Sequence, residues 1–358
     1  MDLLQEARLK IDSVDRQMAA LFEERMAAVG QVAQYKKATG KPIFDPAREA
    51  MVIEKNTALL KNEGLKEDYA AFMRAVMAAS RRYQTRLLFG ERVAFQGMRG
   101  AFSHITAARL FPESCLTAYP SFAAVIEAVE SGEADAGVLP FENSTTGEVG
   151  EVMDLLFTHP DCYVNGWYDL AVQQNLLVLP GTDISRIRQV YSHQQALDQS
   201  ADFLRGRGWE LIPYPNTAMA ASYVSGQKDP AKAAIASEET AALYGLEVLE
   251  KKINSSSVNT TRFAVIGRQQ RLSGERFGLF FTVTNDAGCL ARAVDIISEG
   301  GFNMHCLRSR AMKNLPWEYY FYAEMDGSLA DPAAQTMLEK LRAVCGSLRT
   351  IGCYTKVE

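Results

Sequence analysis

The stretch Arg262-Phe263-Ala264-Val265-Ile266 (RFAVI) is rich in aromatic and β-branched residues, and the polar segment 267–275 follows it directly. This composition predicts a strand that closes a domain, with a linker behind it. Upstream, as far back as Gly90, short β-rich runs alternate with helical stretches. The clearest of these runs are 92–95, 137–139, 175–179 and 189–191. Such alternation indicates an α/β domain.

The segment after the linker predicts a second, smaller sheet domain. Its pattern indicates strand, helix, strand, strand, helix and strand over 277–283, 290–300, 304–309, 317–325, 333–345 and 348–354. A βαββαβ order in so short a segment is typical of the ferredoxin-like fold.

The first quarter of the chain predicts helices only. Residues 3–39 have apolar positions at helical spacing and no proline, and Gly40 and Pro42 then end the helix. Asp45-Pro46 is an N-cap followed by proline at the first position of a second helix, and a third helix covers 66–88. A first helix of that length would run roughly 50 Å. A small domain cannot bury it alone, so we expect an intertwined dimer.

Bulk properties exclude several classes of protein. The 358 residues are 47% apolar and 23% charged, which suits a globular protein of two or three domains. No run of about 18 apolar residues is present and the N-terminus is acidic, so we expect a cytoplasmic protein without signal peptide or membrane span. The net charge of -5 argues against nucleic acid as a partner. The six cysteines and four histidines show no metal-ligand spacing, so we expect neither metal nor cofactor.

Polar residues of the helical segment share faces. Arg25 and Lys36 are eleven positions apart and project from one face of the first helix. Arg8 points about 100° away from Arg25, so a second chain would have to supply it to the same pocket. Ser80 and Gln84 share a face of the third helix at spacing i, i+4. Between the helices lie Asp45, Arg48 and Glu49. Singly, each of these residues suits a solvated surface of a dimerisation domain.

Together, this pattern resembles the all-helical class of chorismate mutase. The rearrangement of chorismate is intramolecular, so the protein acts by holding the reactive conformer and stabilising developing charge. The resemblance implies that Arg25 and the partner subunit's Arg8 clamp the two carboxylates, since arginine matches a carboxylate in a bidentate way. It implies that Lys36 and Gln84 donate to the ether oxygen. Supporting roles fall to Glu49, Asp45, Arg48 and Ser80.

Polar clusters follow the strands of the central region. Residues 95–103 run from a strand through a glycine turn into a helix start, which offers free backbone N–H groups to an anion. The GxGxxG dinucleotide fingerprint is absent from this turn. Further clusters lie at 140–144 with Gly147, 192–197 with Gln199, 216–218, 234–237 and 259–263.

This ordered series resembles prephenate dehydratase over residues 91–268, and the triplet Thr261-Arg262-Phe263 is its most specific mark. The resemblance implies two α/β lobes like those of the type II periplasmic binding proteins, with the ligand between them. It assigns Thr261 the role of proton donor. The expected polar residues of the pocket are Asn143, Ser144, Ser192, Gln199, Thr217 and Arg262. Two residues depart from the family pattern: Gln194 replaces a usual proline, and Gln174 replaces a histidine of many relatives.

The C-terminal segment 276–358 resembles an ACT domain, a small amino-acid-binding regulatory module. The resemblance implies phenylalanine as effector, bound near Asn285, Gly288, Leu290 and Ser309. Three departures predict weak or altered inhibition, namely Cys289 for alanine, Arg308 for glutamate and Ala311 for proline. An alternative is that the domain only assembles the dimer.

The sequence thus predicts three domains over 1–89, 91–268 and 276–358. Their expected function is bifunctional, in phenylalanine biosynthesis: chorismate is rearranged to prephenate, which is then dehydrated and decarboxylated to phenylpyruvate. One alternative is a monofunctional dehydratase with a non-catalytic helical dimerisation domain, and another is a non-catalytic amino-acid sensor. The choice between homodimer and homotetramer, the passage of prephenate between sites and activity on arogenate stay open.

Overall fold

The computed structural model describes residues 2–39, 44–89, 91–256, 258–313 and 315–357. The chain divides into two compact units. The first comprises Met1–Arg92 with Glu113–Cys115, and the second comprises Val93–Pro112 with Leu116–Glu358. The helix breakers expected at Gly40 and Pro42 lie outside the described residues.

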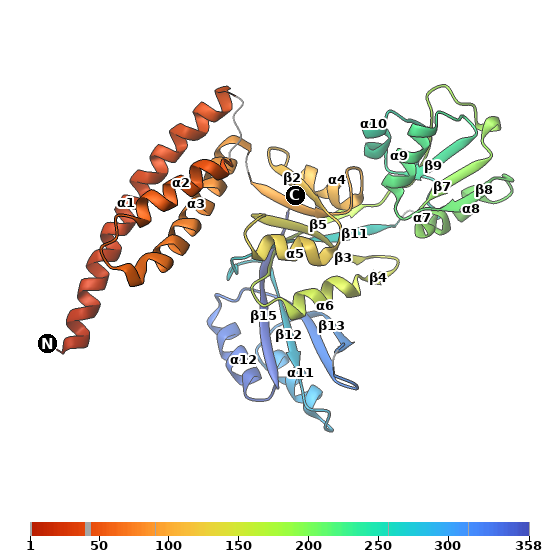
Figure 1. Ribbon diagram of the computed structural model, residues 1–358. Helices are drawn as coiled ribbons and strands as arrows, with labels where there is room; N and C mark the ends of the chain where they lie inside the picture. The colour runs from red at the N-terminus through yellow and green to blue at the C-terminus, as the bar shows by residue number, and fades with distance from the viewer. Residues whose placement is uncertain (1, 40–43, 90, 257, 314, 358) are drawn as a thin grey trace. The chain divides into compact units, whose positions relative to one another are not determined.

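The first unit consists of helices α1 (Leu3–Thr39), α2 (Pro46–Thr57) and α3 (Lys66–Phe89), with a 3-10 turn at Glu63–Leu65 (Figure 1). The predicted N-cap is confirmed, because the Asp45 side chain accepts a hydrogen bond from the backbone N–H of Arg48 at 3.0 Å. Among the described residues, no helix is long and apolar enough to cross a bilayer.

Helix α1 packs against α3 over only part of its length. Ala33 is buried, whereas Ile11, Met18, Leu21 and Phe22 are exposed. A free helix that long with so many exposed apolar side chains would be unfavourable in water. The intertwined dimer stays a prediction that this surface favours.

The second unit begins with an α/β lobe. Its strands are β1 (Arg92–Gln96), β2 (Cys115–Tyr119), β3 (Ala136–Asn143), β4 (Gly147–Glu148), β5 (Tyr163–Ala171) and β11 (Thr260–Gly267), and its helices are α4 (Phe102–Leu110), α5 (Phe122–Glu130) and α6 (Gly150–Thr158). The predicted strand at RFAVI lies within β11, which pairs antiparallel with both β3 and β5. The strand is therefore central to its sheet.

A second lobe is inserted between β5 and β11. Its sheet has the order β10-β6-β9-β7-β8. The strands are β6 (Asn175–Val178), β7 (Gln189–Ser192), β8 (Glu210–Pro213), β9 (Lys232–Ala236) and β10 (Glu247–Glu250), and the helices are α7 (Gln194–Gln199), α8 (Ala201–Leu204), α9 (Thr217–Gln227) and α10 (Glu238–Tyr244), with a 3-10 turn at Ile184–Arg186. The α/β prediction for the central region is confirmed.

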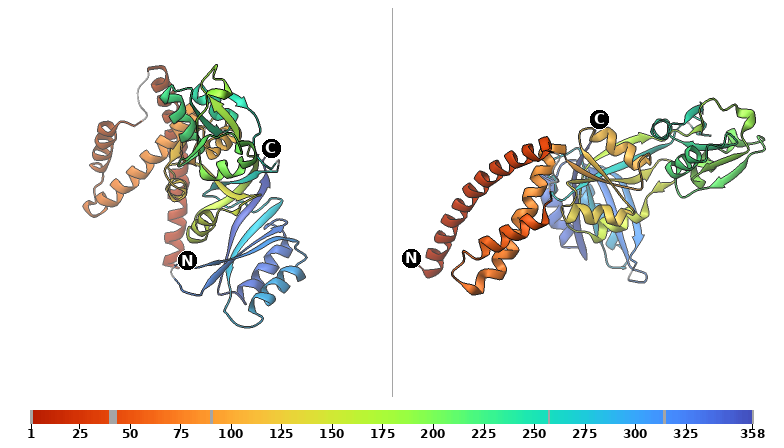
Figure 2. Two further views of the ribbon diagram at one scale, coloured as in Figure 1. Left: turned by 90° about the vertical axis from the view of Figure 1, so that its right-hand side faces the viewer. Right: turned by 45° about the horizontal axis from the view of Figure 1, so that its top comes forward.

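The remaining elements are β12 (Arg276–Thr282), α11 (Cys289–Glu299), β13 (Met304–Ala311), β14 (Tyr319–Asp326), α12 (Pro332–Arg342) and β15 (Ser347–Lys356). We call this part the C-terminal subdomain. Its four strands form an antiparallel sheet in the order β13-β14-β12-β15, and α11 and α12 cover one face (Figure 2). Phe277, Leu279 and Phe281 pack beneath these helices.

The other face of this sheet packs against the first lobe. Phe280, Tyr320 and Tyr322 are fully buried in one core with residues of α6 and with Trp167. The end of β15 pairs in parallel with β5, which makes one continuous sheet through both parts. Since each fully buried aromatic side chain contributes about 1.5–3 kcal/mol, the C-terminal subdomain is firmly attached to the first lobe.

Candidate active sites

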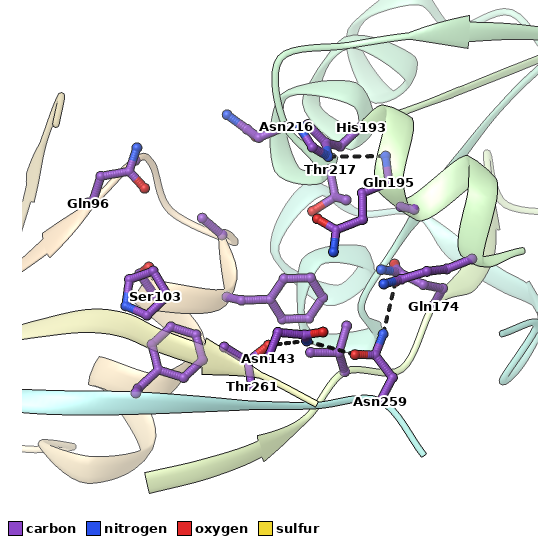
Figure 3. A pocket seen from close by; sticks show the side chains of 18 of the residues that line it. Gln96, Ser103, Asn143, Gln174, His193, Gln195, Asn216, Thr217, Asn259 and Thr261 are labelled. Carbon is purple, nitrogen blue, oxygen red and sulfur yellow. Dashed lines mark hydrogen bonds between the residues drawn. The ribbon is translucent and has the colours of Figure 1, made fainter. Parts of the chain in front are cut away.

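A pocket of about 310 Å³ lies between the two lobes of the second unit (Figure 3). The first lobe contributes the loop after β1, the start of α4 and the ends of β3 and β11. The second lobe contributes the starts of α7 and α9. Polar lining side chains are Gln96, Ser103, Asn143, Gln174, His193, Gln195, Gln199, Asn216, Thr217, Asn259 and Thr261.

Asn143 is the centre of a hydrogen-bond network on the wall formed by the first lobe (Figure 3). Its Nδ2 donates to Oγ1 of Thr261 at 2.9 Å and to Oδ1 of Asn259 at 2.8 Å. Nδ2 of Asn259 in turn donates to Oε1 of Gln199 at 2.9 Å. Oδ1 of Asn143 accepts the backbone N–H of Thr145 at 2.9 Å. Both ends of the amide of Asn143 are therefore held.

This network sets the direction in which Thr261 can donate. Among the hydrogen bonds of the described residues, Oγ1 of Thr261 takes part only as an acceptor, from Asn143. A hydroxyl that accepts one hydrogen bond keeps its own hydrogen for another partner. Because Thr261 lines the pocket beside the aromatic ring of Phe263, that hydrogen is available to a bound ligand in a partly apolar setting.

Anion attraction in the pocket comes from helix termini. Among the described residues that line it, none is Lys, Arg, Asp or Glu. The start of α4, with Ser103, and the start of α9, with Thr217, approach it from opposite lobes. Free N–H groups and the helix dipole favour negative charge at such ends. The arrangement suits a ligand with two carboxylates.

The loop before α4 is held by a neutral histidine. The backbone N–H of Gly100 donates to Nδ1 of His104 at 3.2 Å. Burial, and secondarily the charge of Arg99, lowers the pKa of His104, so the ring is unprotonated at neutral pH and can accept this bond.

Gln174 presents an unsatisfied acceptor at the pocket. The residue is 2% exposed, and its Oε1 is buried with no hydrogen-bond partner among the described residues. A buried acceptor without a partner costs about 1–3 kcal/mol.

Arg262 does not reach the pocket, contrary to expectation. It follows Thr261 on β11, and successive side chains of a strand point to opposite faces. Its Nε donates to Oδ1 of Asp169 at 3.1 Å, and its Nη1 lies 3.9 Å from Oε1 of Glu324. Arg262 is therefore a member of an ion-pair cluster behind the pocket.

Ser192 and Ser144 also lie off the lining. Ser192 is fully buried and its hydroxyl donates to the carbonyl of Ile235 at 2.6 Å. Ser144 is exposed, and its hydroxyl bonds the carbonyl of Val258 and the N–H of Thr260. Both serines fix loops near the pocket. The structure thus brings together only Asn143, Gln199, Thr217 and Thr261 of the predicted set.

Further pocket residues belong to the quoted motifs but are not among the predicted site residues. Asn216 caps α9 by accepting the N–H of Met219 at 2.7 Å. His193 caps α7 by accepting the N–H of Gln195 at 3.3 Å. A polar residue just before a helical run is the usual sign of a cap, so cap rules indicate both positions.

The first unit gathers polar side chains between α1 and α3. Nη1 of Arg25 donates to Oγ of Ser80 at 2.5 Å, and Nη2 donates to Sδ of Met77 at 3.5 Å. Ser80 is 4% exposed and Gln84 is 6% exposed. Within the part of this unit that the structure describes, Oε1 of Gln84 is buried and has no hydrogen-bond partner. Three predicted mutase residues therefore share one site.

The predicted residues around α2 make contacts within the unit. Glu49 forms an ion pair with Arg81, a residue outside the predicted set, whose guanidinium also lies 5.0 Å from the ring centre of Phe44. The carboxylate of Asp45 caps α2 at Arg48. The carboxylate of Glu49, which Arg81 holds in place, can accept a hydrogen bond from a ligand hydroxyl.

Lys36 is partly buried near the end of α1. Arg8 is exposed and lies seventeen residues before Arg25, which is about 26 Å along the helix. Within one chain Arg8 therefore cannot join Arg25 at a single small ligand.

The predicted effector residues lie at one end of the C-terminal sheet and on β13. Gly288 has φ +86 and begins α11, Asn285 precedes it, and Leu290 is in the first turn. Ser309 pairs with Phe321, whose ring stacks on Phe281 beneath α11 and α12.

Two family models match the chain: prephenate dehydratase over residues 93–271 and chorismate mutase type II over residues 7–85. The bifunctional chorismate mutase/prephenate dehydratase of Enterobacter agglomerans is 32% identical, over 97% of this chain and 94% of that protein.

Two solved structures resemble the second unit. GqqA, described as a novel type of quorum quenching acylase, is 27% identical with a TM-score of 0.68, over 74% of this chain and 98% of that chain. Prephenate dehydratase in complex with L-Phe from Arthrobacter aurescens is 24% identical with a TM-score of 0.69, over 74% and 90%. At 24% identity, the similarity to the Arthrobacter structure shows a shared fold and no more.

Proposed function

The chain belongs to the family of bifunctional chorismate mutase/prephenate dehydratases, and from this premise we propose which residues carry its two reactions. The enzyme rearranges chorismate to prephenate and converts prephenate to phenylpyruvate. Dehydration takes place in the pocket between the lobes, with Thr261 as proton donor. Rearrangement takes place at the polar site of the first unit.

The observation that supports Thr261 is the hydrogen bond that it accepts from Asn143. Prephenate must take up one proton, lose its ring hydroxyl as water and lose a carboxylate as CO₂, which leaves an aromatic ring. A donor is therefore needed at the leaving hydroxyl. With its oxygen already engaged by Asn143, Thr261 directs its hydrogen toward the pocket.

The two carboxylates of prephenate would bind at the helix starts. Ser103 lies at the start of α4 and Thr217 at the start of α9. Each supplies a hydroxyl beside free backbone N–H groups. The two carboxylates would thus be stabilised by hydroxyl and backbone N–H donors, without Lys or Arg among the described residues of the lining.

The mutase site needs no nucleophile, because the reaction is intramolecular. Arg25 is placed beside Ser80 and Gln84, where it can bind one carboxylate. Gln84 lies one turn after Ser80 on α3, and its Nε2 donates to the backbone carbonyl of Ser80 at 3.3 Å. The partner subunit's Arg8, with Lys36, would provide the remaining positive charge. Supporting contacts are assigned to Glu49, Asp45 and Arg48.

We assign the C-terminal subdomain to the ACT class as a phenylalanine-responsive module. Its βαββαβ order agrees with a ferredoxin-like fold, and the Arthrobacter prephenate dehydratase was solved with L-Phe. The effector site would include Asn285, Gly288, Leu290 and Ser309. Saturating phenylalanine should raise the melting temperature and lower the dehydratase rate. If phenylalanine changes neither the melting temperature nor the dehydratase rate, the subdomain only assembles the oligomer.

We also propose that the enzyme is a homodimer or homotetramer and that it is located in the cytoplasm. The exposed apolar side of α1 supports self-association. The six cysteines are free thiols, as a reducing compartment would keep them.

The test supplies chorismate to purified protein and follows chorismate loss, prephenate and phenylpyruvate in one time course. Phenylpyruvate should appear after a lag during which prephenate rises. Prephenate that accumulates unchanged would overturn the dehydratase assignment. Chorismate that persists while added prephenate is consumed would make the first unit a non-catalytic dimerisation domain, and no turnover of either compound would fit a sensor.

A further inference from the structure

Two parallel rows of side chains cross the sheet of the first lobe. The strands β4, β3, β11 and β5 are neighbours, and their register aligns residues across all four. One row, here called the pocket row, consists of Gly147, Asn143, Thr261 and Leu170. The next row, here called the charged row, consists of Glu148, Glu142, Arg262 and Asp169. Because side chains alternate along a strand, the charged row faces away from the pocket.

All four strands of the C-terminal subdomain direct a charged side chain at this cluster. These residues are Arg276 of β12, Arg308 of β13, Glu324 of β14 and Lys356 of β15. Arg308 of β13 contacts Glu142 of β3 and Glu148 of β4, so β13 lies against both strands. The charged row is therefore covered from one side by this subdomain.

Arg308 contacts both glutamates of the charged row. It forms a close ion pair with Glu142 and donates to Oε2 of Glu148 at 3.2 Å. Burial by itself lowers the pKa of Arg308, but the hydrogen bonds and charge of Glu142, together with Glu148, raise it above its ordinary value. The side chain of Arg308 is 24% exposed, so solvent screens the pair only in part.

Arg262 is held on the neighbouring strand. It binds Asp169 and approaches Glu324, which accepts from Arg276 at 2.8 Å. The side chain of Glu324 is 7% exposed and lies between the guanidinium groups of Arg262 and Arg276. Lys356 lies 3.5 Å from Asp169 at the far end of the row.

We infer that the C-terminal subdomain positions the catalytic pair Asn143 and Thr261, through Arg308 on Glu142 and Glu324 on Arg262. Each held residue is the immediate chain neighbour of a pocket residue, on the same strand. These contacts hold β3 and β11 on the face away from the pocket and so limit how far the two strands can shift relative to each other. Such a shift would change the 2.9 Å distance between Nδ2 of Asn143 and Oγ1 of Thr261.

The inference rests on the proposed role of this pair in dehydration. Catalytic geometry is sensitive, since a misplacement of about 1 Å can cost roughly 100-fold in rate. The four residues Glu142, Arg262, Arg308 and Glu324 touch no substrate in this arrangement. They are positioning residues.

The experiment measures kcat and KM for prephenate, the chorismate mutase rate and the melting temperature of each variant of the full chain. Arg308→Gln and Glu142→Gln should each lower the dehydratase kcat by about 10-fold while KM changes by less than about 2-fold. The double variant should lose no more than the worse single variant, because the two changes break one contact. Arg308→Lys keeps the charge and should recover most of kcat.

Arg349→Gln is the matched control. Arg349 also joins this subdomain to the first lobe, through the carbonyls of Leu156 and Cys162, but touches neither row. It should lower the melting temperature and leave kcat within about 2-fold of wild type. If Arg308→Gln keeps the wild-type kcat, or if Arg349→Gln loses as much kcat, the contacts are merely structural. Full activity of Asn143→Ala would instead refute the pocket assignment, whichever result Arg308 gives.

Discussion

Thr261 illustrates how much of a catalytic assignment depends on a neighbouring residue. A threonine hydroxyl is a weak acid, and here Asn143 fixes which side of it donates. Four further amide or hydroxyl groups fix Asn143 itself. The chemistry therefore belongs to an ordered network rather than to one side chain.

Asn143→Ala removes the donor to Thr261 and frees that hydroxyl to turn away from the pocket. We expect kcat for prephenate dehydration to fall by about 100-fold, within the usual range for a proton donor. The mutase rate of the same sample should not change, because its site lies in the other unit. A dehydratase kcat equal to that of wild type would contradict the network.

Gln174→Leu tests the unsatisfied acceptor. Leucine has a similar size and no oxygen, so the variant should be more stable by about 1 kcal/mol, since a buried acceptor without a partner is removed. It should also lose about 10-fold in kcat/KM for prephenate. Thermal denaturation measures the gain in stability, and steady-state kinetics on the same preparation measure the loss in kcat/KM. Lower stability with unchanged kcat/KM would show that Gln174 serves packing alone.

His104 gives a pH dependence with a definite sign. Its pKa is lowered by burial and by Arg99, so below about 6.5 the unfolded chain binds a proton more readily than the folded one. The stabilising contribution is complete above about pH 6.5 and is lost as pH falls. When the pH is lowered from 7.5 to 5.5, the free energy of unfolding, measured by urea denaturation, should fall more for the wild type than for His104→Gln. Equal losses would exclude His104 as the titrating group.

At the scale of elements, the sequence predicted the strands and helices better than the direction of their side chains. RFAVI, the N-cap at Asp45 and the order of elements after residue 276 follow from local patterns. Arg262 was expected in the pocket because it belongs to the triplet Thr261-Arg262-Phe263. Successive side chains of a strand point to opposite faces, so Arg262 faces away from the pocket and binds Asp169. The hydrogen bond of Ser192 to Ile235 joins β7 to β9 and is a non-local contact that no local pattern contains.

The helix starts make a testable contribution to binding. Thr217→Val keeps the shape of the first residue of α9 and removes its hydroxyl, so KM for prephenate should rise by about 10-fold with little change in kcat. Thr106→Val is the control, because the hydroxyl of Thr106 bonds the carbonyl of Phe102 and does not line the pocket. Equal KM values for the two variants would argue against an anion site at α9.

At the scale of the whole molecule, the two chemistries occupy separate compact units. Within the second unit, the sheet of the first lobe continues into that of the C-terminal subdomain through β5 and β15. Arg308, which departs from the family pattern, lies on β13 at the opposite edge of the subdomain's sheet and binds Glu142 of the first lobe. Local sequence patterns could not reveal this contact, because the two residues are 166 positions apart.

The most direct test of the central claim replaces Thr261 with valine and with serine, and measures both activities in each preparation. Valine keeps the shape without the hydroxyl, and serine keeps the hydroxyl. We predict that Thr261→Val loses at least about 100-fold in dehydratase kcat, that Thr261→Ser keeps most of it, and that both retain the wild-type mutase rate. Dehydration by Thr261→Val at the wild-type rate would contradict the account.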